Sequence, residues 1–220
     1  KVYDAGEKVE ITKDTTFTAL WRNNLGIVVD IIGGAVEGKE FFTDVSMGDW
    51  YYEAVKFCFD YDLMNGVGNG KFSPDTTLTR AMLAQVLYNL DEARGSYAGV
   101  FTDVTGSAWY ANAVNWAAAS GIVEGKGNNK FDPDAPVTRQ EMAAIFYRYA
   151  SYKGYDVSAA ASLDRFTDAS KVASWAKDAM SWAVGGYVIN GKGAGRLDPT
   201  GTATRAEVAQ ILMNFCNNVL

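Results

Sequence analysis

The 220-residue sequence contains no histidine. This absence excludes catalytic triads of the Ser-His-Asp type, Cys-His catalysis, histidine metal ligands and the commonest general base. Cysteine is also scarce, because only Cys58 and Cys216 are present, too few for a disulfide framework or a zinc-binding pattern. The sequence leaves open whether these two residues form one disulfide or are two small buried hydrophobic side chains. We expect neither a metal nor a cofactor.

Long hydrophobic runs and clusters of basic residues are absent as well. The longest apolar stretch, residues 26–36, is interrupted by Asp30 and two glycines and is too short to span a bilayer. The 20 basic and 26 acidic residues give a formal charge of −6, which argues against nucleic acid as a partner. Any anionic ligand must therefore be bound locally. The chain does not begin with methionine and has no signal peptide, so we expect a piece of a longer or processed protein.

From residue 41 onward the sequence repeats itself three times. The opening Phe-Thr-Asp recurs at residues 42–44, 101–103 and 166–168. A tryptophan follows in each copy, and 30 residues separate it from a later arginine in all three (50 to 80, 109 to 139 and 175 to 205). Constant spacing of this kind indicates one structural unit used three times.

Each copy predicts two helices joined by a glycine-rich loop that ends near a proline. The first helix is expected to begin at the tryptophan, with the tryptophan on its inner face beside small residues four apart. The second helix carries an apolar stripe. A unit of about 55 residues buries too little surface to be stable alone, so we expect the three units to share one core. The predicted stripes are Leu83, Val86, Leu87 and Leu90; Met142, Ile145, Phe146 and Tyr149; and Val208, Ile211, Leu212 and Phe215.

The second helix of every copy begins with Thr-Arg. In the second and third copies the pattern Thr-x-x-Glu predicts a capping box, in which the threonine oxygen and the glutamate satisfy amides of the first helical turn. We therefore assign a structural capping role to five residues: Thr79, Thr138, Thr204, Glu141 and Glu207.

The arginines Arg80, Arg139 and Arg205 lie in the first turn of these helices. A cation there faces the positive end of the helix dipole, which is unfavourable by about 0.3–1 kcal/mol. We interpret the arginines as receptors for a carboxylate or phosphate, held by a bidentate guanidinium and by free amides of the helix N-terminus. The alternative is a structural arginine that bridges two repeats.

Residues 1–24 differ from the rest of the chain. Alternating segments at 2–11 and 16–21 predict two β-strands of a hairpin. The ending Thr-Phe-Thr-Ala-Leu-Trp resembles the last strands of internalin B-repeat-type surface repeats, so we interpret residues 1–24 as the end of a preceding β repeat. Residues 25–40 form a connector whose apolar part fits a strand or a short helix equally well.

The motifs of residues 41–220 together resemble the S-layer homology domain. They are the Phe-x-Asp-Val opening, Trp-Tyr-x-x-Ala-Val, a Gly-x-Gly loop ending in Phe-x-Pro, and Thr-Arg-Ala-Glu. The resemblance implies a mainly α fold, in which three helix-loop-helix repeats (41–99, 100–164 and 165–220) lie in a pseudo-threefold arrangement around a central helical bundle. Two positions depart from the pattern: Met82 replaces the glutamate in repeat one, and Ala176 replaces the tyrosine in repeat three.

The same resemblance implies a noncatalytic, extracellular module that anchors a protein to the cell wall. The implied ligand is an anionic, pyruvylated secondary cell-wall polysaccharide linked to peptidoglycan, bound in grooves between repeats. A pyruvate ketal carries a carboxylate, the kind of anion inferred for the arginines. Besides the three arginines, the candidate ligand-binding residues are Asp44, Asp103, Asp168, Trp50, Trp109, Trp175, Lys126 and Lys192.

Several of these candidates have a structural alternative. The aspartates also suit an Asx-turn or a helix-entry cap, and the tryptophans also suit the core. At the level of function, one rival is a protein–protein module for surface-layer self-assembly with neighbouring surface-layer proteins. A glycosidase using two carboxylates is a weaker rival, because the acidic residues recur with each repeat whereas an active site should be unique.

Overall fold

The computed structural model describes residues 20–22, 28–30 and 41–220, and the chain divides into two units, residues 1–39 and 40–220. In the first unit, β1 (Leu20–Arg22) pairs antiparallel with β2 (Val28–Asp30). Part of the predicted connector is therefore a strand, and the boundary predicted between residues 24 and 25 falls between the two paired strands. The strand predicted at residues 2–11 lies outside the described residues.

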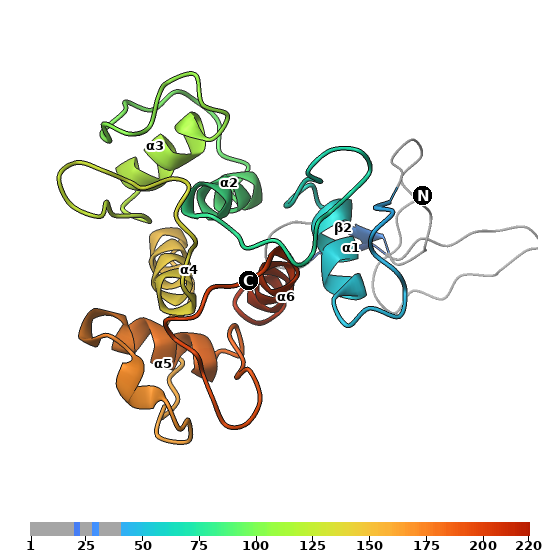
Figure 1. Cartoon of the computed structure of the whole chain (residues 1–220), viewed down its shortest axis with the longest axis vertical. Coiled ribbons are helices and arrows are strands. Elements are labelled where there is room, and N and C mark those ends of the chain that lie inside the picture. The colour runs from blue at the N-terminus through green and yellow to red at the C-terminus, as the bar shows by residue number, and fades with distance from the viewer. Residues whose placement is uncertain (1–19, 23–27, 31–40) are drawn as a thin grey trace, which may run out of the picture. The chain divides into compact units, whose positions relative to one another are not determined.

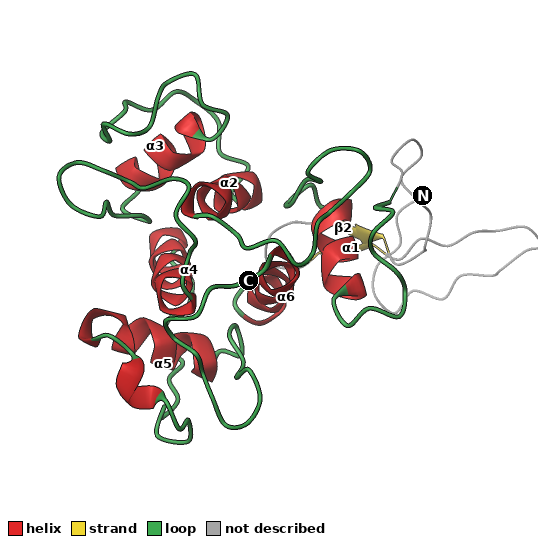
Figure 2. Cartoon of the chain, in the orientation of Figure 1, coloured by secondary structure: helices red, strands yellow, loops and turns green. Residues whose placement is uncertain are grey.

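The second unit is mainly helical, with two α-helices from each repeat joined by loops (Figure 2), which confirms the predicted fold class. In the described part of the chain, no helix is long and apolar enough to cross a membrane. The α-helices are α1 (Tyr52–Asp60), α2 (Arg80–Leu90), α3 (Ala111–Ala119), α4 (Arg139–Lys153), α5 (Lys177–Gly185) and α6 (Arg205–Asn218). Two short 3₁₀ helices, η1 (Ala169–Lys171) and η2 (Ser174–Ala176), precede α5.

The principal helix packing runs between repeats. The first helix of each repeat packs on the second helix of another repeat: α3 on α2, α5 on α4, and α1 on α6. Figure 1 shows α2, α4 and α6 around the middle of this unit, with α1, α3 and α5 outside them. At the α2–α3 contact, the rings of Tyr88 and Trp116 lie 5.6 Å apart, and Asn112 Nδ2 donates a 2.8 Å hydrogen bond to the Tyr88 hydroxyl. Packing α1 on α6 joins the first repeat to the third.

The core lies between the second helices. All twelve residues of the predicted stripes are buried. The rings of Phe146 and Phe215 lie 5.0 Å apart, and those of Tyr149 and Phe215 lie 5.8 Å apart, so α4 and α6 meet through aromatic contacts. Cys58 and Cys216 are buried free thiols on α1 and α6. Burial raises the pKa of Cys216 to about 12, as expected for a thiol in the interior of a helix pair.

The prediction that Trp50, Trp109 and Trp175 lie on the buried inner face of the first helices was wrong. These helices begin two residues after each tryptophan, at Tyr52, Ala111 and Lys177. Trp50 and Trp109 are each 64% exposed, and Trp175 is 55% exposed. The small residues on the predicted face are buried, and so are Trp116 and Trp182, which the sequence also places on that face.

Each glycine-rich loop folds back onto the opening of its own repeat. A Cβ atom at Gly66 would lie 2.7 Å from both the Phe42 ring and the Lys71 carbonyl oxygen, so only glycine fits there. The carboxylate of Asp44 accepts hydrogen bonds from the amides of Phe72 and Ser73, at 2.7 and 2.8 Å. Asp103 and Asp168 brace the corresponding loops in the same way. The aspartates therefore span the repeat, and the amides they bind lie far beyond the reach of the expected Asx-turn or helix cap.

We expect this bracing to make the fold sensitive to acid. The Leu197 amide lowers the pKa of Asp168, burial opposes the shift, and the Asp198 amide adds to it. Because the folded pKa lies below the unfolded value of about 3.9, the carboxylate stabilises the fold above about pH 4 and loses this contribution as pH falls through the folded pKa. The melting temperature should therefore decrease as the pH is lowered below about 4. Asp168→Asn should flatten this drop, whereas Asp178→Asn, at an exposed site on α5, should not. Parallel acid profiles for Asp168→Asn and the wild type would contradict the bracing role.

Candidate ligand-binding grooves

Three grooves occupy equivalent places in the three repeats, and each is numbered here by the repeat that supplies its loop and second helix. Groove 1 has a volume of about 500 Å³, groove 2 about 340 Å³ and groove 3 about 330 Å³. Each groove also contains the Thr-Arg arginine of one of the other two repeats and the exposed tryptophan of the remaining repeat. The principal polar and aromatic residues are Asn65, Gln85, Asn89, Trp109 and Arg205 in groove 1; Arg80, Glu124, Lys126, Glu141, Arg148 and Trp175 in groove 2; and Trp50, Arg139, Asn190, Lys192, Glu207, Gln210 and Asn214 in groove 3.

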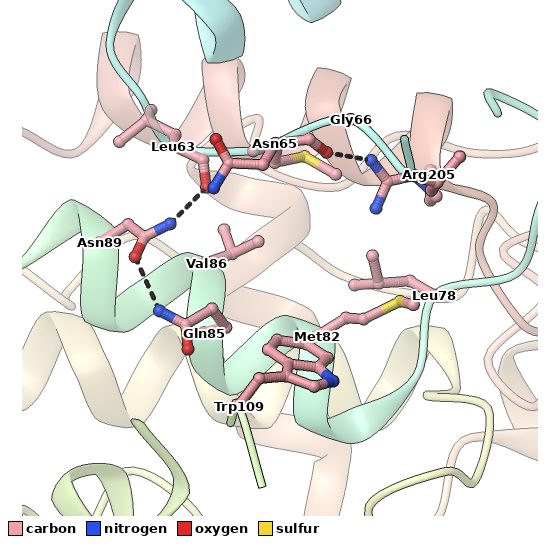
Figure 3. A pocket seen from close by; sticks show the side chains of 12 residues that line it. Leu63, Asn65, Gly66, Leu78, Met82, Gln85, Val86, Asn89, Trp109 and Arg205 are labelled. Atoms are coloured by element: carbon pink, nitrogen blue, oxygen red, sulfur yellow. Dashed lines mark hydrogen bonds between the residues drawn. The ribbon is translucent and has the colours of Figure 1, made fainter. Parts of the chain in front are cut away.

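The arginines at the base of the grooves clasp the loop of a neighbouring repeat. Arg205 Nε donates to the Phe72 carbonyl oxygen at 2.8 Å, and its Nη2 donates to the Asn65 carbonyl oxygen at 2.6 Å (Figure 3). Arg80 and Arg139 bind carbonyl oxygens of repeats two and three in the same manner. All three side chains are at most 5% exposed. The arginines therefore do have a structural role, because they join each repeat to the next.

The helix N-termini are not free to bind an anion. The amides of Arg80 and Ala81 donate to the carbonyl oxygens of Ala135 and Pro133 in repeat two, each at 3.0 Å. The corresponding amides of α4 and α6 are bound in the same way, and the next amide in each helix donates to the threonine side chain. Nε and Nη2 of each arginine are also occupied. The predicted receptor of free amides and a bidentate fork was thus wrong in its geometry, and the guanidinium offers a ligand its Nη1 side and its charge.

Glutamates cap the second helices of repeats two and three and also face the grooves. Both form capping boxes with the threonine at the helix start. The Oε1 atom of Glu141 contacts Lys126 and lies 3.6 Å from Arg80 Nη1, while the Oε1 atom of Glu207 lies 2.8 Å from Lys192 Nζ. Burial alone would raise the pKa of Glu141, but hydrogen bonds from Lys126 and Thr138 outweigh it and hold that pKa below the usual range.

Groove 1 lacks this ion pair. Met82 and Val67 occupy the positions that correspond to the glutamate and the lysine. The Thr79 side chain still accepts a hydrogen bond from the Met82 amide, at 3.3 Å, so the threonine cap persists without the glutamate. The wall of groove 1 is consequently more apolar than those of grooves 2 and 3.

The tryptophans place an exposed aromatic ring at each groove. Trp109 lines groove 1, Trp175 lines groove 2 and Trp50 lines groove 3. The predicted ligand-binding arginines, tryptophans and lysines are therefore brought together. Asp44, Asp103 and Asp168 are not among the groove-lining residues, and their oxygens are engaged by loop amides.

Polar residues on the second helices also line two of the grooves and were not predicted from the sequence. Gln85 and Asn89 line groove 1, and Gln210 and Asn214 line groove 3 at the same offsets from the Thr-Arg step. In both helices the glutamine side chain donates to the asparagine four residues on, at 2.8 and 2.9 Å. Their signal in the sequence is the recurrence of a Gln-x-x-x-Asn pair beside two of the apolar stripes.

The fold and grooves define a three-repeat, mainly helical module with ligand-sized clefts between its repeats. The chain belongs to the S-layer homology domain family, whose model matches residues 41–82, 100–143 and 165–209. Members of this family are cell-wall anchoring modules of surface-layer proteins and surface enzymes, and membership places the chain at the cell surface or cell wall.

Relatives of the chain include both enzymes and surface-layer proteins. It is 32% identical to Exoglucanase XynX of Acetivibrio thermocellus, with 81% of this chain and 16% of that protein covered. It is 32% identical to Amylopullulanase of Thermoanaerobacterium thermosulfurigenes, with 81% and 10% covered. It is also 32% identical to the Surface-layer 125 kDa protein of Lysinibacillus sphaericus, with 76% and 14% covered. The chain thus spans less than a fifth of the length of these relatives.

Proposed function

We propose that this chain is a noncatalytic module that anchors an extracellular protein by binding an anionic, pyruvylated secondary cell-wall polysaccharide in its three grooves. The observation that carries the proposal is the composition of each groove. An arginine, a polar helix face and loop, and an exposed tryptophan come from three different repeats and meet in one cleft. These groups match an acidic saccharide, because the cation attracts the carboxylate, amide side chains bind hydroxyl groups, and an aromatic face packs on a sugar ring.

Three grooves also suit a polymer better than a free sugar. When several sites engage one chain of repeating units, weak individual affinities add up to firm attachment. An anchor of this kind does not require any single groove to bind tightly.

The test compares wall fragments that retain or lack their secondary polysaccharide. The chain should sediment with complete fragments and remain in solution when the polysaccharide has been removed. Replacing Trp50, Trp109 and Trp175 together with alanine should weaken sedimentation about tenfold or more while changing the melting temperature little, because all three side chains are more than half exposed.

The matched control for the tryptophan variant is Met47→Ala, since Met47 is 84% exposed and lies outside the grooves. It should bind like the wild type. Equal sedimentation with stripped and complete fragments would contradict the proposal. Lateral assembly of the chain without any wall material would instead support the rival role in surface-layer self-assembly.

A further inference from the structure

The three grooves differ in how the charge of the arginine is balanced. In groove 2, Glu141 lies 3.6 Å from Arg80 and contacts Lys126 as well. In groove 3, Glu207 pairs with Lys192 at 2.8 Å and lines the groove together with Arg139. Among the described residues, no acidic side chain lines groove 1. An incoming anion would therefore meet a resident carboxylate in grooves 2 and 3, but not in groove 1.

Arg205 in groove 1 is a buried cation with an unused side. The residue is only 5% exposed, and Nε and Nη2 bind carbonyl oxygens of repeat one. Figure 3 shows the remaining terminal nitrogen pointing into the pocket, and no partner for it is found among residues 41–220. No acidic side chain among the described lining residues of groove 1 pairs with this buried cation, so an anion bound here would add a favourable ion pair.

The surroundings of Arg205 restrict what that anion is. Leu78, Met82, Val86 and Val67 line the same pocket as Arg205. One positive charge in an apolar wall suits a singly charged carboxylate on a partly apolar group. A dianionic phosphate would bring a second charge that nothing in groove 1 neutralises.

We propose that groove 1, despite its departure from the glutamate-bearing pattern, is the tight carboxylate site of the chain, and that grooves 2 and 3 bind the same acidic sugar more weakly. The inference rests on the proposed function and refines it by assigning different affinities to the three grooves. In groove 1, Arg205 holds the carboxylate of the sugar, and Met82 and Val67 contact the apolar part of the ligand. In grooves 2 and 3 a resident glutamate is already paired with a lysine of the same groove.

The test exchanges the distinguishing residues between grooves. Met82→Glu with Val67→Lys installs the ion pair of groove 2 in groove 1. Glu141→Met with Lys126→Val makes groove 2 resemble groove 1. The threonine cap of α2 is present without a glutamate, so both variants should fold, and thermal melts check this. Each protein is titrated calorimetrically with a pyruvylated disaccharide, with the methyl ester of that disaccharide, and with inorganic phosphate.

We expect the wild type to show one tight site for the acid. The methyl ester should bind this site at least about tenfold more weakly than the acid does. The groove 1 exchange should abolish this preference, and the groove 2 exchange should raise the number of tight sites from one to two. Three equal sites in the wild type, or an unchanged preference after the groove 1 exchange, would overturn the inference and leave the proposed function standing. Phosphate binding as tight as the acid would overturn the assignment to carboxylate. Failure of both saccharides and of wall fragments to bind would instead refute the proposed function itself.

Discussion

Replacing Arg139 with alanine is expected to lower the free energy of unfolding by about 3 kcal/mol or more. The side chain is 4% exposed and donates to two backbone carbonyl oxygens of repeat three, those of Leu197 and Asn190. Hydrogen bonds to charged groups contribute roughly 1.5–3 kcal/mol each, and the substitution leaves both carbonyl groups without their partner. Since a domain of this size is stable by only about 5–15 kcal/mol, the loss should be plain in urea unfolding curves.

Two further variants make the result specific. Arg139→Lys should recover only part of the stability, because a lysine keeps the charge but cannot reach both carbonyl oxygens with a planar fork. Arg148→Ala is the matched control, since Arg148 is a half-exposed groove arginine whose ion-pair partner Glu124 is 73% exposed. It should cost less than about 1 kcal/mol. Equal losses for Arg139→Ala and Arg148→Ala would show that the clasp contributes little.

The same clasp changes how binding data on these arginines must be interpreted. From the sequence, ligand binding was the favoured role of these arginines, and a structural bridge between two repeats was the alternative. In the structure each arginine holds two repeats together and also borders a groove. A variant that loses wall binding can therefore have lost its fold, so the exchange at Met82 and Val67, which spares Arg205, is the cleaner probe of the ligand site.

The features that the sequence predicted well are those set by local periodicity. The repeats, the two helices of each, the buried stripes and the threonine caps follow from residues close together in the chain. The arginine contacts could not be predicted, because their partners are backbone carbonyl groups 44 to 140 residues away and carry no side-chain signature. Exposure of Trp50 was equally hidden, because a shift of two residues in the helix start moves the side chain from the inner face to the surface.

The sequence also could not predict which helices of neighbouring repeats pack together. Periodicity shows that a helix has one apolar face, but it does not show which other helix covers that face. Because the repeats are alike, packing a first helix on the second helix of its own repeat or on that of the preceding repeat satisfies the same pattern. The observed choice, with α3 on α2 and α5 on α4, makes each repeat depend on its neighbours.

We therefore expect a single repeat, residues 100–153, to be largely unfolded. It contains α3 and α4, but the principal partner of α3 is α2 in repeat one and that of α4 is α5 in repeat three. Helices of 9 and 15 residues that have lost their principal packing partners are marginal in water. Circular dichroism of this fragment should show little helix and no cooperative melt, whereas residues 41–220 should unfold in one transition.

A fragment of similar length that crosses the repeat boundary should retain more helix. Residues 76–123 keep α2 with its Thr79 cap, α3, the Tyr88–Trp116 ring contact and the hydrogen bond from Asn112 to Tyr88. This fragment preserves the principal helix pair of α3, whereas residues 100–153 keep only the ring contacts of Trp116 with Tyr149 and Tyr152. Trp116→Ala should lower the helix content of residues 76–123 to that of residues 100–153, because this side chain is 1% exposed and fills the contact between α2 and α3. A cooperative melt of residues 100–153, together with equal or lower helix content in residues 76–123, would show that each repeat stabilises itself and that the exchange of helices between repeats is secondary.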